Sequence, residues 1–238
     1  MKFSILHPSR SRPEKSFTTI QSWKEFSSGK NEIETIVSID KSDLFGIKYY
    51  GAYEKFNHPI HRVSFIEHEN RSAVDAINNA VKVATGDIFI VVSDDTSPIN
   101  NWDELILKEV EGKTDWILKT QDGIQDYIIT FPVMDRVYYN RFGYIYHPDY
   151  HHLFADTYMT CVADINGRKL TCNLMFKHNH YSSSGGKEGP DELHKRNDAT
   201  WAQGEDLFIK LMKEFTPDQL SRITNVSMRN WLKMKRVL

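Results

Sequence analysis

Cysteine is scarce in this chain of 238 residues, which has only Cys161 and Cys172. Two cysteines do not make a disulfide framework, and their spacing differs from that of a paired zinc knuckle, so we expect two buried free thiols. Long hydrophobic runs are missing too: residues 88–92 form the longest strongly apolar run, whereas a membrane-spanning helix needs about 20 residues. Because the N-terminus also lacks an apolar segment of signal-peptide length, we expect a cytoplasmic protein.

An excess of charge of either sign is also lacking. The chain has 30 Lys and Arg against 32 Asp and Glu, a formal net charge of −2, which excludes a generally basic nucleic-acid coat. Its 40% hydrophobic and 12% aromatic residues exclude a disordered chain, which would lack the apolar surface that offsets ordering entropy. Residues 221–238 are a local exception, with basic residues and no acid. We expect a closing amphipathic helix there; docking on nucleic acid or anionic lipid is the alternative.

Strand-like and helix-like segments alternate along the first half of the chain. Runs rich in β-branched residues predict strands, and apolar residues three or four positions apart predict helices. The predicted strands are residues 3–6, 33–39, 62–67 and 88–92, and the predicted helices are residues 16–26 and 73–84. This alternation predicts an α/β domain with a mostly parallel sheet.

The second half is less regular. Residues 127–150 are aromatic and loop-rich, and residues 182–189 are flexible by composition. The elements predicted here are helices over residues 155–165, 207–215 and 226–237 and a strand over residues 169–176.

Ligands of parallel sheets bind beyond the carboxyl ends of the strands. The most informative strand end is Ser93-Asp94-Asp95-Thr96, because adjacent carboxylates repel each other unless a cation or hydrogen-bond donors neutralise them. Mg²⁺ and Mn²⁺ take oxygen ligands and commonly share their coordination sphere with substrate phosphates. A turn or capping role is the alternative, and this motif alone does not decide between the two.

The surroundings of this motif resemble family 2 glycosyltransferases with the GT-A fold. The resemblance lies in Asn70-Arg71-Ser72, in the helix over residues 73–84, in the turn Ala84-Thr85-Gly86-Asp87, and in an apolar strand that leads to Asp94-Asp95-Thr96 where the family often has Asp-x-Asp. It implies a single Rossmann-like domain of the nucleotide-diphospho-sugar transferase type. Residues 1–100 would form the nucleotide-sugar-binding half, and residues 101–238 the acceptor-side half with the C-terminal helices.

The resemblance also implies a donor site. The residues that it assigns to the nucleotide sugar are Pro8, Ser9, Arg10, Asp40, Asn70, Arg71 and Asp94. Arg10 suits the diphosphate because a guanidinium pairs well with phosphate, whereas Arg12 receives no role. Asp95 is assigned to Mn²⁺ or Mg²⁺, although the motif leaves open which of the two aspartates touches the metal and which the ribose.

Two further elements complete the implied site. Asp156 stands before a helix where the family carries its catalytic base; a plain N-cap is the alternative, and Glu205-Asp206 is a competing acidic pair. His178 or His180, after the next strand, would complete the metal site, since imidazole suits Mn²⁺. A rival zinc hydrolase site would combine His147, His151, His152, His178 and His180 with Asp149 or Asp156, but their spacing matches no known zinc pattern.

We therefore expect a metal-dependent, inverting glycosyltransferase that uses a nucleotide sugar, by default a UDP-sugar. The acceptor hydroxyl could belong to a glycan, a lipid-linked sugar, a protein or a hydroxymethylated DNA base, the last of these in a viral enzyme acting in the host cytoplasm. The alternatives are a nucleotidyltransferase, whose Gly-rich first loop is absent here, and a non-catalytic module that binds nucleotide sugars.

Overall fold

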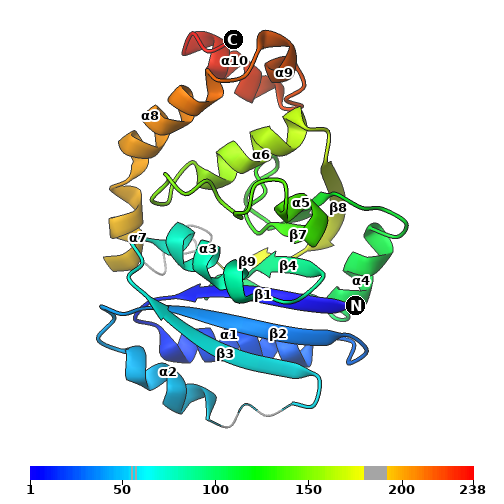
Figure 1. Cartoon of the computed structure of the whole chain (residues 1–238), viewed down its shortest axis with the longest axis vertical. Coiled ribbons are helices and arrows are strands. Elements are labelled where there is room, and N and C mark those ends of the chain that lie inside the picture. The colour runs from blue at the N-terminus through cyan, green and yellow to red at the C-terminus, as the bar shows by residue number, and fades with distance from the viewer. Residues whose placement is uncertain (55, 57, 180–191) are drawn as a thin grey trace.

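A seven-stranded sheet runs through the centre of the molecule in the computed structural model, which describes residues 1–54, 56, 58–179 and 192–238 (Figure 1). The strand order is β3-β2-β1-β4-β7-β6-β8. Strands β1 to β4 are mutually parallel, β7 runs antiparallel to both of its neighbours, and β6 is parallel to β8. The strands are β1 Lys2–Ser9, β2 Glu32–Asp40, β3 His61–His68, β4 Ile88–Val91, β6 Ile117–Gln121, β7 Val133–Asp135 and β8 Lys169–Met175. The predicted α/β fold with a mostly parallel sheet is confirmed.

Helices cover both faces of this sheet (Figure 1). One face packs against α1 Pro13–Glu25, α2 Gly46–Tyr53 and α4 Trp102–Glu109. The other packs against α3 Ala73–Val83, α5 Arg136–Tyr139 and α6 Ala155–Ile165. Helices α8 Trp201–Met212, α9 Pro217–Ser221 and α10 Val226–Met234 extend the same hydrophobic cluster beyond α6, against which α8 and α9 pack (Figure 1). A short helix, α7 Glu192–Asp198, precedes α8, and β5 Thr96–Ser97 pairs with β9 Lys177–His178 in a small second sheet. No described helix is long and apolar enough to cross a membrane.

The predicted elements agree with the structure where the hydrophobic pattern was strong. The helix expected over residues 155–165 has those bounds in α6, and all six elements expected in the first hundred residues are present. Cys161 and Cys172 are buried and free, as predicted. The helix expected over residues 207–215 begins earlier, at Trp201, and the last helix ends at Met234. The segment 182–189 lies outside the described residues.

An aromatic cluster fixes the chain just after the Asp94-Asp95 pair. Trp23 and Trp102 stack edge to face at 5.0 Å, and Phe176 contacts Trp23 at 5.1 Å. The Trp102 indole donates to the carbonyl of Trp23 at 2.8 Å, and the Trp23 indole donates to the carbonyl of Thr96 at 3.3 Å. Because large buried aromatic rings with satisfied N–H groups hold their neighbours firmly, α1, α4 and the segment before β9 together set the position of β5.

Gly86 closes the turn between α3 and β4 under tight steric limits. A Cβ at this position would lie 2.5 Å from the Ser4 Oγ and 2.8 Å from the Ser4 amide nitrogen. The carboxylate of Glu34 accepts from the amides of Thr85 and Gly86, at 2.6 and 3.1 Å. Burial would raise the pKa of Glu34, but its hydrogen bonds with Lys2, Ser4 and Thr85 outweigh this and lower it to about 2.

Replacing Gly86 with alanine should therefore destabilise the fold. The added methyl group would push apart β1 and the α3–β4 turn, and overpacking of this kind costs about 2–3 kcal/mol. Denaturant unfolding measures the change. Gly51→Ala is the matched control, because a Cβ there meets no atom within 4 Å and alanine favours a helix by up to about 1 kcal/mol. Equal stabilities of the two variants would contradict this interpretation of the turn.

Candidate active site

Two adjoining cavities open at the carboxyl ends of the parallel strands. The first has a volume of about 380 Å³ and lies over the ends of β1 and β2 and the start of α3, with α7 opposite. The second, of about 390 Å³, lies over the Asp94-Asp95 turn and reaches α6 and β9. The two share the residues Pro8, Ala73, Asp94, His152 and Asn197. They form one continuous cleft at the sheet edge where the sequence predicts ligand binding.

All seven residues predicted to bind the nucleotide sugar line the first cavity. Arg10 forms an ion pair with Asp40 at 2.7 Å, and Asp40 also accepts from the amide and the hydroxyl of Ser42, both at 2.7 Å. Asn70 uses its amide group on the chain itself, because it donates to the Ile39 carbonyl at 3.2 Å and accepts from Asn79 at 2.9 Å. Asn70 therefore holds the end of β2 against α3.

Two more arginines add positive charge to this cavity. Arg71 forms a bidentate pair with Asp75 and donates to the Pro148 carbonyl at 2.7 Å. Arg196, on α7, lines the cavity and donates to the Arg71 carbonyl at 2.9 Å. Arg196 was not among the predicted site residues, since its contact with Arg71 depends on how the C-terminal helices fold back toward the cleft.

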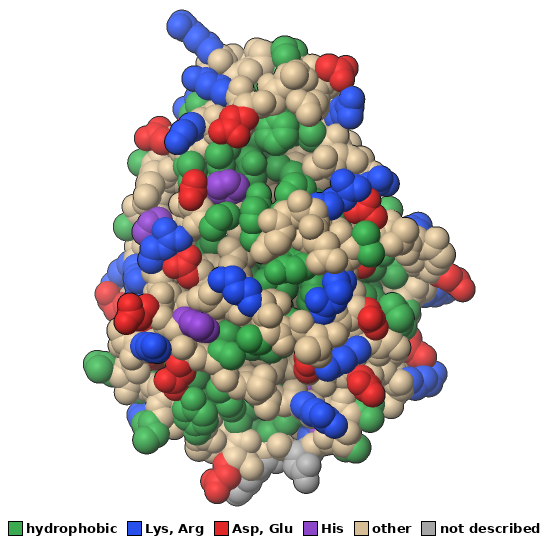
Figure 2. Space-filling model, in the orientation of Figure 1, with side chains coloured by type: hydrophobic (Ala, Val, Ile, Leu, Met, Phe, Trp, Pro, Cys, Tyr) green, Lys and Arg blue, Asp and Glu red, His purple; other side chains and the backbone are tan. Residues whose placement is uncertain are grey.

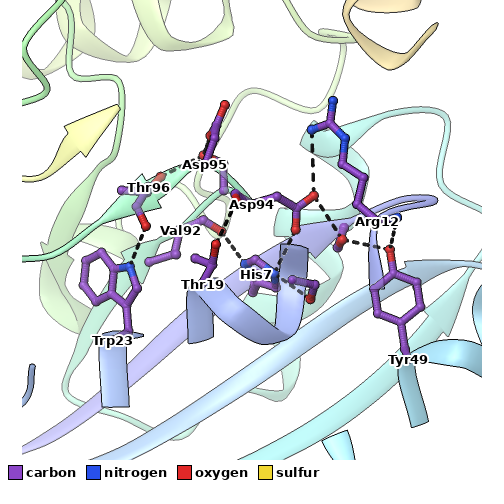
Figure 3. A network of polar contacts seen from close by, with 12 residues as sticks. His7, Arg12, Thr19, Trp23, Tyr49, Val92, Asp94, Asp95 and Thr96 are labelled. Atoms are coloured by element: carbon purple, nitrogen blue, oxygen red, sulfur yellow. Dashed lines mark hydrogen bonds and ion pairs between the residues drawn. The ribbon is translucent and has the colours of Figure 1, made fainter. Parts of the chain in front are cut away.

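Asp94 is held from below by a buried network (Figure 3). The imidazole of His7, which is fully buried, donates through Nδ1 to the Val92 carbonyl at 2.7 Å and places Nε2 3.2 Å from Asp94 Oδ1. Ser9 donates to Asp94 Oδ2 at 3.1 Å and contacts the Tyr49 hydroxyl at 2.8 Å. Asp94 Oδ1 lacks a well-aligned hydrogen-bond donor, so this carboxylate keeps the capacity to accept from a ligand or a cation.

Asp95 points the other way, into the second cavity. Its Oδ2 lies 3.3 Å from His178 Nε2, and its Oδ1 accepts from the Ser93 hydroxyl. Two backbone contacts bring His178 close to Asp95. Thr96 pairs with His178 between β5 and β9, and the Asn179 amide donates to the Asp95 carbonyl at 2.8 Å. Burial would raise the pKa of Asp95, but the interactions with His178, Ser93 and Arg12 outweigh it and hold that pKa well below its usual range.

Arg12 belongs to the site, although it was not among the predicted site residues. Its guanidinium lies 3.9 Å from Asp94 Oδ2 and lines the second cavity (Figure 3). Its backbone amide donates to the Tyr49 hydroxyl at 3.1 Å, and Ser11 before it adopts a positive φ of 59°. This turn brings the guanidinium back over the carboxylates, which sequence spacing does not reveal.

Asp156 stands at the first turn of α6 and lines the second cavity with Asp95 and His178. Gly204 of α8 lets the residues just before α6 pack closely against α8, because a Cβ at position 204 would lie 2.4 Å from the Leu153 carbonyl oxygen. The Asp156 carboxylate accepts from the amide of Thr157 at 2.7 Å. Burial raises its pKa above the ordinary aspartate value, despite this hydrogen bond.

The competing candidates lie elsewhere. Glu205 pairs with Lys235, the residue that caps the C-terminal end of α10, and neither Glu205 nor Asp206 lines the two cavities. Among residues 1–179 and 192–238, apart from 55 and 57, no three His, Cys, Asp or Glu side chains are close enough to hold a metal by themselves. The rival zinc site is therefore not assembled there. His180 falls outside the described residues.

The residues around Asp95 nevertheless fit a hard divalent cation. Two ligands that bind one such ion at adjacent positions lie about 3 Å apart, close to the 3.3 Å between Asp95 and His178. Asp94 Oδ1 adds an oxygen without a well-aligned donor. Mg²⁺ and Mn²⁺ sites of this kind use few protein ligands and complete their shell with phosphate oxygens and water.

The fold and this cleft define a transferase-like α/β enzyme, and comparison with known proteins gives its family. Glycosyl transferase family 2 matches residues 18–180, more than half of the chain. The chain therefore belongs to glycosyl transferase family 2, and it is a glycosyltransferase. A search of curated protein sequences gave no match.

Solved structures agree on the fold. The mannosyltransferase PcManGT from Pyrobaculum calidifontis, in complex with GDP-Man and Mn²⁺, has 14% identity and a TM-score of 0.59 over 99% of this chain and 84% of that chain. TarS of S. aureus, residues 1–349 with UDP-GlcNAc, has 14% identity and a TM-score of 0.63 over 93% of this chain and 69% of that chain. These likenesses show the GT-A fold.

The buried network predicts that His7 controls donor binding. His7→Phe should fill a similar space but leave the buried Val92 carbonyl without its donor and remove the imidazole beneath Asp94, which costs about 1–3 kcal/mol of stability. We expect UDP to bind roughly tenfold more weakly in the presence of Mn²⁺, because Asp94 loses the imidazole that helps to position it. This is a loss of about 1.4 kcal/mol of binding free energy, which calorimetry would measure.

His61→Phe provides the control. His61 is equally buried and contacts Thr35 at 2.7 Å, on the β2–β3 side away from both cavities. Its substitution should leave nucleotide affinity unchanged. If both variants bound UDP as the wild type does, the role given to His7 would be wrong.

Proposed function

We propose that this enzyme transfers a sugar from a nucleotide sugar, by default a UDP-sugar, to an acceptor hydroxyl, with inversion at the anomeric carbon and with Mn²⁺ or Mg²⁺. One observation carries the proposal: the candidate base Asp156 and the candidate metal ligands Asp95 and His178 line a single cavity, which adjoins the cavity of the seven predicted nucleotide-sugar residues. The nucleotide sugars named with the similar structures, GDP-Man and UDP-GlcNAc, support this class of donor.

The first cavity would hold the nucleotide and direct its diphosphate toward the second. Arg10, Arg71 and Arg196 place guanidinium groups around its wall, and guanidinium pairs well with phosphate oxygens. Arg12 lines the second cavity, 3.9 Å from Asp94 Oδ2, where its charge would face the departing diphosphate. The second half of the chain also contributes to this cavity, through His151, His152 and Arg196. The division into a nucleotide-sugar-binding half, residues 1–100, and an acceptor-side half, residues 101–238, stays a prediction.

Asp95 and His178, with Asp94 beside them, would hold the divalent ion. When bound, such an ion supplies positive charge that stabilises a leaving diphosphate. The protein then needs one base rather than an acid and a base. Asp156 would take the proton of the acceptor hydroxyl while that oxygen forms the bond to the anomeric carbon and the bond from this carbon to the diphosphate oxygen breaks. Its raised pKa makes it a stronger base than an exposed aspartate.

The acceptor would enter along the wall that carries Phe131, Tyr146 and Leu153, which line the second cavity beside Asp156. Phe131 and Tyr146 belong to the aromatic segment 127–150. Aromatic and apolar surfaces of this kind suit the faces of a sugar ring or a nucleobase. We propose an acceptor of one of these two kinds, a glycan or a hydroxymethylated DNA base.

The metal site can be tested through binding alone. Mn²⁺ should strengthen the binding of UDP or GDP to the wild type, and Asp95→Ala should weaken the metal-dependent part at least about tenfold, because it removes a direct ligand. Calorimetry with and without chelator measures this. Asp126→Ala, an exposed aspartate outside both cavities, should behave as the wild type. Identical metal dependence in the two variants would refute the site.

The base can be tested through its pH dependence. Asp156→Asn should bind donor normally but transfer roughly 10²–10⁴ times more slowly, the usual worth of a general base. Transfer by the wild type should fall as the pH drops through the raised pKa of Asp156, because the protonated carboxyl cannot accept the acceptor's proton. This acid limb should be absent from the variant's residual rate. Normal transfer by Asp156→Asn would place the base elsewhere.

A further inference from the structure

The attraction of the cleft for a diphosphate depends on where single guanidinium groups lie. Basic and acidic side chains are interspersed over the face of the molecule in Figure 2, and the formal net charge of the chain is −2. The described residues of this face therefore form no broad positive field that would attract phosphate over a distance. Arg10 and Arg12 come from one short loop, residues 9–12, which we call the 9–12 loop. Its conformation decides whether both guanidinium groups reach the cleft.

A strained residue lies inside the 9–12 loop. Ser11 has a φ of 59°, in the left-handed region that glycine adopts readily and other residues seldom do. Asp43, which is buried, accepts from the Ser11 amide through Oδ2 at 2.6 Å and from the Ser11 hydroxyl through Oδ1 at 3.1 Å. The Phe45 amide donates to the same Oδ1 at 3.0 Å. Asp43 therefore ties the strained residue to the N-terminal end of α2.

A chain of hydrogen bonds from Tyr49 holds both ends of the 9–12 loop (Figure 3). Tyr49 lies on α2 and is fully buried. The Ser9 hydroxyl has one proton and donates it to Asp94 Oδ2 at 3.1 Å, so Tyr49 is the donor in the 2.8 Å contact between the two hydroxyls. The Tyr49 oxygen accepts from the Arg12 amide at 3.1 Å. Burial raises the pKa of Tyr49, which keeps its hydroxyl protonated.

We propose that Asp43 and Tyr49 are positioning residues, which hold the 9–12 loop so that Arg10 and Arg12 face the diphosphate of the nucleotide. Neither side chain lines the two cavities, so both act through the loop rather than by touching the nucleotide. The segment between β2 and α2 also fixes Arg10 directly, because this guanidinium donates to the Ser42 hydroxyl at 3.1 Å. The inference rests on the proposed function, which supplies the diphosphate.

Tyr49→Phe tests the hydrogen-bond chain, because it removes one hydroxyl and keeps the buried ring. The Arg12 amide loses its acceptor and Ser9 its donor, so the affinity for UDP with Mn²⁺ should fall roughly tenfold by calorimetry. UMP lacks the second phosphate and should lose no more than about twofold. A general loosening of the fold would instead lower both affinities in the same proportion. If the wild type prefers GDP, GDP and GMP are the probes.

Tyr50→Phe is the matched control. It removes the hydroxyl of the next residue on α2, which is 46% exposed and donates to Glu67 at 2.8 Å. Tyr50 lines neither cavity. Both nucleotides should therefore bind to this variant as they do to the wild type.

Asp43→Ala tests the strained residue. Without the carboxylate, Ser11 should relax toward a negative φ and displace Arg12, and the affinity for UDP should again fall roughly tenfold. Adding Ser11→Gly to this variant should restore most of the loss, because glycine adopts a φ near 59° without strain. Such a rescue shows that Asp43 acts by holding a backbone conformation and not by its charge.

Three results would each overturn the proposal. They are an undiminished UDP affinity in both Tyr49→Phe and Asp43→Ala, an equal loss for UDP and UMP, and no recovery on adding Ser11→Gly. A wild type that bound neither UDP nor GDP with Mn²⁺ would show that the proposed nucleotide site itself is wrong. Wild-type binding that these variants leave intact would refute only the role given to Asp43 and Tyr49.

Discussion

Two adjacent carboxylates at the end of a buried strand are the constraint on which the rest of this structure depends. Asp94 and Asp95 follow β4, and like charges so close together need separate partners. The fold turns them in opposite directions: Asp94 lies over His7 and Ser9, while Asp95 faces His178. Arg12 lies beside both. The two carboxylates are thus held in fixed positions at the mouth of the cleft, and Asp94 Oδ1 can still accept from a cation.

Much of the surrounding architecture serves this arrangement. The parallel pairing of β1 with β4 brings His7 under the Asp94 turn, and the Trp23–Trp102 cluster fixes β5 just beyond it. The pairing of β5 with β9 then carries His178 to Asp95. Packing, more than local turn preference, therefore determines the geometry of the site.

The sequence was informative where a local pattern carried the signal. The strands before Asp40 and Asp94 and the bounds of α6 follow from apolar periodicity, and the seven predicted donor residues line one cavity because carboxyl ends of parallel strands meet at one edge. His7, Arg12 and Arg196 were not found, since each acts through a partner distant in sequence. Helix α2 was also missed, because Gly46 and Gly51 lower its helix propensity and it is held by tertiary contacts such as the burial of Tyr49 and Tyr53.

The central claim is that Asp95 and His178 bind a divalent ion that carries the donor's diphosphate. The most direct measurement is a crystal structure of the chain with Mn²⁺ and UDP, with the metal located by its anomalous scattering. The account predicts one strong peak at bonding distance, about 2.2 Å, from an Asp95 oxygen and a His178 nitrogen, and UDP in the cavity of Arg10 and Asp40. A peak among His147, His151 and His152, or UDP bound in that cavity with no metal at Asp95, would contradict it.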